Sequence, residues 1–201
     1  YLLHRGIDRK VISDCIRAGI LYESARFHNA VFVGRDENGV PKYAFLRGTL
    51  TNTAESFRAE VAGSDKRYCF CLQPEGESRR VAVYEAAIEV LAHLSLEQTR
   101  DKYRLSLGGI YAPKEGFNAS SFKKPAALTA FLEQHPNVCE IEICTNNDYA
   151  GRWAADHIRK EYEGKYQIIM NLPEREGADY GDLAQEKSKE RAVRQRAALS
   201  R

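Results

Sequence analysis

Hydrophobic and polar positions follow two different rhythms along this chain. In the first part, Ile7, Val11 and Cys15 recur at helical spacing, and apolar runs at 31–33 and 43–46 flank an Asn-Gly turn. Asn-Gly between two such runs is typical of a β-hairpin. A further apolar run predicts a strand at 68–72. The pattern therefore predicts a small α+β unit over residues 1–77.

From residue 78 onward, short apolar runs alternate with segments whose apolar residues repeat every three or four positions. The strands expected from the runs cover 80–84, 103–107, 138–144 and 166–172. The helices expected between and after them cover 86–96, 121–134, 148–162 and the chain from 179. Strands that alternate with helices are typical of a parallel sheet with helices on its faces. We expect a four-stranded parallel sheet over 78–183, followed by a basic helix or tail at 184–201.

The charge of the chain is nearly balanced, with 30 Lys and Arg against 28 Asp and Glu and a formal net charge of +2. This balance predicts no strong overall attraction to nucleic acid. The exception is the end of the chain, where 184–201 carries six basic and two acidic side chains. Such a segment either contacts backbone phosphates or forms a solvated, mixed-charge helix or linker.

Several classes of protein are excluded by what the sequence lacks. No apolar run approaches the length of a membrane span, and no signal-peptide pattern opens the chain. The five cysteines follow no disulfide or zinc spacing, which favours free thiols in a cytoplasmic protein. The chain begins with Tyr1, and its single methionine is Met170. We therefore expect a piece of a longer protein, with upstream or downstream domains missing.

Acidic and amide side chains follow three of the four expected strands. Glu85 follows the first, Asn146 and Asp148 follow the third, and Asp179 follows the fourth. Ligands of open parallel sheets bind at the carboxyl ends of the strands, where these residues should meet. Because clustered carboxylates repel one another, a divalent cation would stabilise them, and oxygen ligands suit Mg²⁺ or Mn²⁺. The four residues are the predicted metal site, and a metal there could support phosphoryl transfer.

Each of these residues also has a purely structural interpretation. Glu85 would be stabilised near a helix N-terminus, and Asp148 and Asp179 are suitable N-caps for the helices that follow them. Asn146 is a common turn former. The sequence leaves both interpretations open.

Several segments of the second part resemble Toprim domains. Residues 81–89 (VAVYEAAIE) are similar to the strand that ends in the family's glutamate, here Glu85. Residues 140–152 (EIEICTNNDYAGR) are similar to the strand followed by D-x-D and A-G-R, and 105–109 resemble the small-residue turn between the two motifs. Residues 177–183 (GADYGDL) resemble a segment of primase-type members. The resemblance implies a compact parallel core with Mg²⁺-dependent activity on nucleic-acid phosphodiesters.

The front part carries a second resemblance. Segments 5–8, 46–49 and 63–68 are similar to an uncharacterised domain that precedes Toprim in proteins of plasmids, phages and conjugative elements. Together the resemblances imply primase-like nucleotidyl transfer in the replication or transfer of a mobile element, with DNA or RNA and nucleotides as partners. They imply catalytic roles for Glu85 and Asp148 and metal binding by the D-x-D carboxylates.

The chain departs from the family pattern at functional positions. The first Asp of D-x-D is Asn146, the Asp four residues after the glutamate is Glu89, and Ala178 and Gly181 replace a Lys and an Asn. A neutral amide weakens cation binding, which depends on ligand charge. Three functions therefore remain: a primase-type nucleotidyltransferase, a Toprim module that binds DNA, RNA or nucleotide without turnover, and a Toprim nuclease.

Basic residues in expected turns are the candidate nucleic-acid contacts. Arg47, Lys66 and Arg67 could reach backbone phosphates from the front unit, and Arg152 follows the D-x-D segment. Each could equally be a solvated surface residue. Trp153 fits a core position better than a base-stacking one. We expect the front unit to pack on the Toprim-like core and to form one side of a nucleic-acid groove.

Overall fold

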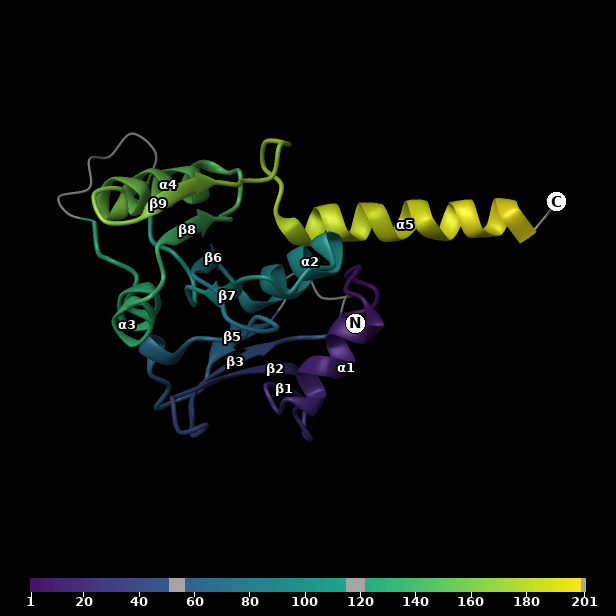
Figure 1. The fold of residues 1–201 in the computed structure, drawn as a ribbon. Coiled ribbons are helices and arrows are strands. Elements are labelled where there is room, and N and C mark those ends of the chain that lie inside the picture. Colours follow the sequence, from purple (N-terminus) through teal and green to yellow (C-terminus); the bar gives the residue numbers. More distant parts are fainter. Residues whose placement is uncertain (51–56, 115–121, 200–201) are drawn as a thin grey trace.

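The computed structural model describes residues 1–50, 57–114 and 122–199, which form two sheets with helices around them (Figure 1). The elements of the front part are α1 (Arg9–Arg17), β1 (Leu21–Glu23), β2 (Ala30–Arg35), β3 (Pro41–Arg47), β4 (Arg58–Glu60) and the 3-10 turn η1 (Lys66–Tyr68). The later elements are β5 (Cys71–Leu72), β6 (Arg80–Tyr84), α2 (Ala87–Glu97), β7 (Tyr103–Ser106), α3 (Ala126–Gln134), β8 (Glu140–Ile143), α4 (Tyr149–Tyr162), β9 (Gln167–Met170) and α5 (Tyr180–Leu199).

The first sheet is antiparallel throughout, in the order β1-β2-β3-β4. The predicted hairpin is its centre. Asp36 accepts hydrogen bonds from the backbone N–H groups of Asn38 and Val40, and Gly39 takes a φ of +76° that favours glycine. The short strands β1 and β4 were not predicted, because three-residue strands carry too few positions for a period to be recognised.

The second sheet has the order β5-β7-β6-β8-β9. The four strands β7, β6, β8 and β9 are mutually parallel, which confirms the expected four-stranded parallel sheet. The expected front-unit strand at 68–72 was wrong in extent and place. Residues 66–68 form η1, whose first turn is capped by Asp65 accepting from the backbone N–H of Arg67. Only β5 is extended, and β5 pairs antiparallel with β7 of the second sheet.

Both faces of the parallel sheet are covered. Successive side chains of a strand point to opposite faces. In β6, Val81 and Val83 pack with residues of α3 and α4, while Ala82 and Tyr84 pack with α2 and the start of α5. Because both faces of β6 are covered, apolar side chains are favoured at successive positions, and Val81–Val83 are fully buried.

The front unit packs on the parallel sheet as expected. One cluster of buried side chains joins Val11 of α1 and Phe32 of β2 to Leu91 of α2 and Tyr84 of β6. The hydroxyl of Ser95 in α2 also accepts from the backbone N–H of Asp8, 2.9 Å away. The predicted boundary at residues 77 and 78 remains a prediction, because the packing is continuous across it.

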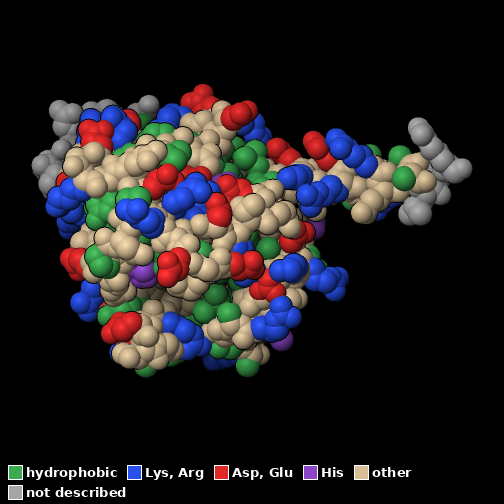
Figure 2. Space-filling view, viewed as in Figure 1, with side chains coloured by type: hydrophobic (Ala, Val, Ile, Leu, Met, Phe, Trp, Pro, Cys, Tyr) green, Lys and Arg blue, Asp and Glu red, His purple; other side chains and the backbone are tan. Residues whose placement is uncertain are grey.

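The last helix, α5, leaves the body of the molecule as a long rod (Figure 1). Its first turns are anchored, since Tyr180 and Ala184 are buried, whereas 189–198 are exposed. Lys and Arg side chains are spread along the projecting part (Figure 2). The helix continues across the predicted boundary at 183 and 184. Within the described ranges, no helix combines the length and apolar character of a membrane span.

A buried histidine sits among aromatic rings between the sheet and α5. Nδ1 of His93 is 2.8 Å from the hydroxyl of Tyr84, and its ring stacks on Tyr180 with centroids 3.9 Å apart. Burial lowers the pKa of His93 to about 4, against the smaller opposing effect of Glu97. The folded protein therefore holds this side chain neutral where the unfolded chain would protonate it.

We expect the free energy of unfolding to fall as the pH drops from 6.5 to 4. In this interval His93 binds one more proton in the unfolded state than in the folded state. The contribution of the neutral His93 to the free energy of unfolding is therefore complete above pH 6.5 and is lost as the pH falls toward 4. The loss due to this group is about 3 kcal/mol. Urea unfolding at several pH values should show that His93→Gln removes this part of the pH dependence. An unchanged slope in the variant would contradict the assignment.

Candidate functional site

Glu85 begins the site because it directly follows β6 at the carboxyl edge of the parallel sheet. Its carboxylate Oε1 accepts from the backbone N–H of Asn146 at 2.9 Å, across the gap between the ends of β6 and β8. Its backbone oxygen accepts from Gly109, after β7, at 2.8 Å. Since β6 lies between β7 and β8, Glu85 is linked to both neighbouring strand ends.

The turn after β8 is held tightly. Asn147 donates from its side chain to the oxygen of Pro173 at 2.9 Å and from its backbone to Ala178 at 3.0 Å. In Asn146, by contrast, the buried Oδ1 has no hydrogen-bond partner among the described residues. A Cβ at Gly151 would lie 2.0 Å from the backbone oxygen of Asn146 and 2.8 Å from Oε1 of Glu85. The glycine of the A-G-R segment therefore lets α4 approach the site closely.

The two aspartates of the predicted site both act as helix caps. Asp148 is exposed and accepts from the backbone N–H of Gly151 at 2.7 Å, as an N-cap of α4. Asp179 accepts from the backbone N–H of Asp182 at 2.7 Å, and Asp182 accepts in return from Asp179 at 3.3 Å. The structural interpretation of these residues is thus correct, but each carboxylate has a second oxygen, so capping does not exclude a ligand.

Carboxylate repulsion and burial both affect the acids of the site. Burial raises the pKa of Glu85 to about 7, with the nearby Asp148 and Asp179 adding to the rise and the hydrogen bond from Asn146 opposing it. Burial also raises the pKa of Glu89, with Glu85 and Asp179 contributing. The side chain of Glu89 is 5% exposed and accepts from the backbone N–H of Ala86 at 3.2 Å. The site therefore collects carboxyl groups in a partly dry environment that disfavours their charged forms.

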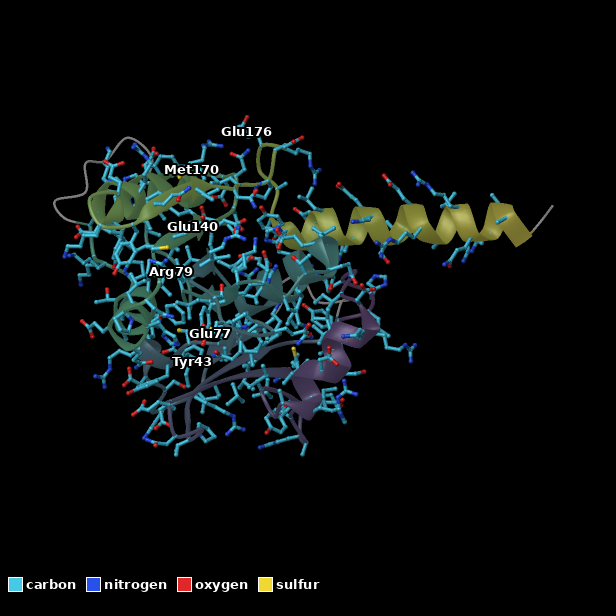
Figure 3. The ribbon with its side chains drawn as sticks, viewed as in Figure 1. Tyr43, Glu77, Arg79, Glu140, Met170 and Glu176 are labelled. Carbon is cyan, nitrogen blue, oxygen red and sulfur yellow. The ribbon has the colours of Figure 1, made fainter. Side chains whose placement is uncertain are left out.

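A pocket of about 300 Å³ joins these acids to basic groups of the front unit. Glu85, Glu89, Asn146 and Asp179 line one part of it. The other part is lined by residues of the first segments and strands, among them Arg5, Tyr43, Arg47 and Arg58. Tyr43, from β3, is labelled in Figure 3. Carboxylates and guanidinium groups thus face one cavity from the two units.

Sequence reasoning missed two of these arginines. Arg5 is half-buried, and its Nε has no hydrogen-bond partner within the described part of the chain. The bare Cα of Gly181 makes room for it, because a Cβ there would lie 3.0 Å from Nη2 of Arg5. Arg58 comes from β4, a strand that was not predicted. The only signal for Arg5 in the sequence is the Arg-Gly pair at residues 5 and 6, which belongs to a segment that resembles the front domain.

The predicted nucleic-acid contacts have different surroundings. Arg47 lines the pocket, and its Nε donates to the hydroxyl of Tyr1 at 3.2 Å. Lys66 donates to the backbone oxygen of Gly108 at 3.0 Å, at the rim of the site. Arg67 is engaged in a two-pronged pair with Asp65, away from the pocket lining. Of these three, only Arg47 lines the carboxylate pocket; Lys66 lies beside it, with its Nζ also 3.3 Å from the carboxylate of Glu60.

Arg152 points to the turn after β8. Its Nη1 donates to the backbone oxygen of Asn147 at 3.0 Å and lies 3.3 Å from the carboxylate of Glu176. Glu176 is labelled on the loop before α5 in Figure 3. The arginine thus braces two loops at the edge of the site, and a phosphate contact would require it to leave Glu176.

The donors of the site fit a hard divalent cation in kind. They are oxygens of Glu85, Asn146, Asp148 and Asp179, and the unpartnered Oδ1 of Asn146 is a buried acceptor that a cation would satisfy. However, no three His, Cys, Asp or Glu side chains in the described ranges already lie close enough together to hold a metal ion. A cation would therefore have to draw these carboxylates together.

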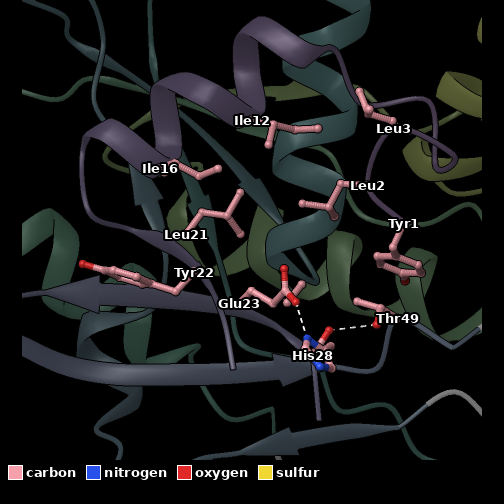
Figure 4. A pocket seen from close by; sticks show the side chains of 11 residues that line it. Tyr1, Leu2, Leu3, Ile12, Ile16, Leu21, Tyr22, Glu23, His28 and Thr49 are labelled. Carbon is pink, nitrogen blue, oxygen red and sulfur yellow. Dashed lines mark hydrogen bonds and ion pairs between the residues drawn. The ribbon is translucent and has the colours of Figure 1, made fainter. Parts of the chain in front are cut away.

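A second pocket, of about 510 Å³, lies in the front unit between the first residues, α1 and β1 (Figure 4). Its lining is mostly apolar, with Leu2, Ile12 and Leu21 among the residues drawn. At its edge His28 contacts Glu23 and accepts from Thr49 through its backbone oxygen. Among the described residues, this lining contains no Lys or Arg side chain for a phosphate, which distinguishes the pocket from the carboxylate site.

Comparisons with known proteins agree with this architecture. The model of a family described as "Protein of unknown function (DUF3991)" matches residues 1–76. The primase fragment of the bacteriophage T7 primase-helicase protein superposes with a TM-score of 0.61 at 15% identity, over 94% of this chain and 72% of that chain. A DnaG primase catalytic domain bound to single-stranded DNA gives 0.57 at 19% identity, over 99% and 70%.

The Aquifex aeolicus primase, with its zinc-binding and RNA polymerase domains, gives a TM-score of 0.56 at 15% identity. The match covers 96% of this chain and 53% of that chain, so this chain spans about half of that structure. A comparison with curated proteins finds no significant sequence match. At such low identities the likeness establishes the fold, and this chain has the Toprim-like α/β fold of primase catalytic fragments.

Proposed function

We propose that this chain is a primase-like nucleic-acid protein that transfers nucleotides at the Glu85 site, in the replication or transfer of a mobile element. The observation that carries the proposal is the pocket in which Glu85, Asn146 and Asp179 face Arg47 and further arginines. Guanidinium groups bind phosphate oxygens through paired donors, and carboxylates bind the cations that accompany phosphates. A pocket with both kinds of group therefore suits a triphosphate or a phosphodiester together with its cation.

In the proposed mechanism, Mg²⁺ or Mn²⁺ would be held by Glu85, Asn146, Asp148 and Asp179 and would neutralise charge on the reacting phosphate. The arginines of the front unit would orient the phosphates and offset their charge. Glu85, which is linked by hydrogen bonds to the ends of β7 and β8, would be fixed in position toward the reacting group. The resemblance of the front segments to domains of mobile-element proteins supports the proposed setting.

A primer-synthesis assay tests this function. Single-stranded DNA template, ribonucleotides and Mg²⁺ or Mn²⁺ should yield short, metal-dependent products, while a labelled strand without nucleotides should stay intact. Cleavage of that strand would indicate a nuclease instead. If the protein binds the strand but neither synthesises a product nor cleaves the strand, its function is that of a binding module.

The binding-only alternative is favoured by two observations. Asn146 supplies a neutral oxygen where the family has a carboxylate, and the described residues contain no preformed three-ligand metal group. A site with less negative charge holds a cation more weakly. In this alternative the same arginine pocket would bind a nucleotide or strand without turnover.

The Asn146→Asp variant should bind Mg²⁺ about tenfold more tightly than the parent chain, because it adds a carboxylate to the proposed site. Without metal the variant should melt at a lower temperature, since the new charge is repelled by Glu85 and Asp148. Calorimetric titration with MgCl₂ and thermal melts with and without Mg²⁺ measure both effects. Asn137→Asp adds the same charge at an exposed position outside the site and should change neither. Equal Mg²⁺ affinity would mean that residue 146 does not face the metal.

A further inference from the structure

Four aromatic rings gather on the surface beside the carboxylate site, and we call Tyr111, Phe122, Trp153 and His157 the aromatic platform. Trp153 and His157, one turn apart on α4, stack with centroids 3.8 Å apart and planes 24° apart. The ring of Phe122 lies 5.9 Å from Trp153 and 5.4 Å from His157. Tyr111 meets Trp153 edge-on at 6.4 Å.

No platform residue is a buried member of the hydrophobic core, although Phe122 packs against its edge. Tyr111 is 66% exposed, and Phe122, Trp153 and His157 are only half-buried. The core position expected for Trp153 is therefore wrong, because the core-facing side of α4 is formed by Ala155 and Ile158. Partly exposed aromatic rings with fixed mutual geometry offer flat apolar surface at little cost in conformational entropy, which suits stacking of a ligand.

The platform adjoins the carboxylate site through a shared glycine turn. Tyr111 and Phe122 line a pocket of about 340 Å³ together with Gly108 and Gly109. The same two glycines line the pocket that contains Glu85. At Gly109, with a φ of +95°, a Cβ would meet nothing within 4 Å, so the backbone between the two pockets is open to a ligand.

The charges around the platform complement a phosphate backbone. Lys66 and Lys123 line the same pocket as Tyr111, and both side chains are exposed. Lys66 also lies 3.3 Å from the carboxylate of Glu60, which a phosphate would have to displace. Arg152 lies next to Trp153 in α4, with 44% of its side chain exposed, and it would contact a phosphate on leaving its pair with Glu176. Flat rings for stacking with ammonium groups beside them are the combination by which proteins bind single-stranded nucleic acids.

We propose that the aromatic platform stacks a base of a single-stranded nucleic acid, whose phosphates lie toward Lys66 and Lys123 and lead to the Glu85 site. This inference rests on the proposed nucleic-acid function and adds where an unpaired base is held. A duplex would not suit the platform, because the faces of its bases are already stacked.

The test uses Trp153 as the reporter, because it is the only tryptophan of the chain. Two probes are titrated into the protein: oligo-dT of about 12 nucleotides, and an abasic strand with the same number of phosphates. We expect oligo-dT to quench the Trp153 emission and to bind about tenfold more tightly than the abasic strand.

Tyr111→Ala should weaken oligo-dT binding about tenfold, leave the abasic strand unaffected and keep the salt dependence of the parent chain, because stacking releases no counterions. Phe122→Leu should act in the same direction. Phe27→Ala is the matched control, since Phe27 is 63% exposed on the front unit, away from the platform, and should change nothing.

Three outcomes would overturn the inference. If wild type binds oligo-dT and Tyr111→Ala binds it equally well, the platform does not stack a base. The same conclusion holds if Tyr111→Ala loses affinity for oligo-dT and for the abasic strand by the same factor. In both cases the proposed function stands. If dTTP alone quenches Trp153 as strongly as oligo-dT, the base comes from a nucleotide and the assignment to a strand is wrong. If wild type binds neither strand, the nucleic-acid function and the inference fail together.

Discussion

Glu85→Gln should reduce primer synthesis at least about 100-fold while leaving the fold intact. The amide keeps an oxygen that can accept from the backbone N–H of Asn146, now 2.9 Å from the carboxylate, so the turn after β8 should stay in place. What is lost is the negative charge and the ability to take up a proton at the end of β6. Initial rates of primer synthesis, with thermal melting as the check of folding, measure the effect.

Glu77→Gln provides the matched control for this variant. Glu77 is an exposed carboxylate before β6, labelled in Figure 3, and it does not line the carboxylate pocket. The same change of charge there should leave the rate unchanged. Equal rates for the Glu85→Gln variant and the parent chain would remove Glu85 from the reaction. Strand binding without synthesis by the parent chain would instead point to the binding-only alternative.

Lys102→Met should destabilise the protein by about 3–5 kcal/mol. Nζ of Lys102 lies 2.6 Å from Oε2 of Glu142 and 3.0 Å from Oε1 of Glu97, and the side chains of Lys102 and Glu142 are only 4% and 5% exposed. Removing the ammonium group leaves a buried carboxylate without its main partner. Urea unfolding at neutral pH measures the loss.

Two further variants separate this effect from a general effect of losing a lysine. Lys10→Met removes one of the three basic partners of Asp14, in a pair where the lysine is 78% exposed, and it should cost less than about 1 kcal/mol. Glu142→Leu combined with Lys102→Met should recover much of the lost stability, because no buried charge then remains unpaired. If the single Lys102→Met variant is as stable as the parent chain, the buried pair is not the stabilising contact that the distances indicate.

The buried pair also connects the core to the site. Glu142 accepts from the side chain of Asn171 at 2.5 Å, and it lies in β8, which leads directly to Asn146. Asn171 follows β9, and its backbone oxygen accepts from the hydroxyl of Tyr180 at 2.7 Å. The ends of β8 and β9 and the start of α5 are therefore positioned by one polar network beneath the carboxylates.

Much of the second part could be predicted from the sequence because its signals are local. The continuous apolar run of β6 and the three-to-four-residue period of α4 are each contained in one short stretch of sequence. Each can therefore be recognised without knowing what packs against it. The side chains that follow the strands could be placed at one edge because parallel strands end on the same side. Glu85 and Asn146 are indeed in hydrogen-bond contact, although their roles remain a prediction.

The predictions that failed depended on contacts distant in sequence. Residues 68–72 are apolar enough for a strand of the front unit, but β5 finds its partner in β7, more than thirty positions later. The alternation Glu-Ile-Glu-Ile in β8 has the pattern of a half-exposed strand. Nevertheless Glu142 is buried, because α2 and α5 cover that face and Lys102 reaches it from the start of β7.

The sequence by itself determined the succession of strands and helices, the parallel sheet and the edge at which acidic residues collect, since each depends on local periodicity and on the direction of the chain. Only the tertiary structure decided which basic groups face those acids. Arg5 and Arg58 come from an irregular segment and a three-residue strand, and they reach the pocket because the front unit packs on the parallel sheet. The tertiary structure likewise left Trp153 half-buried outside the core, because Ala155 and Ile158 fill the core side of α4.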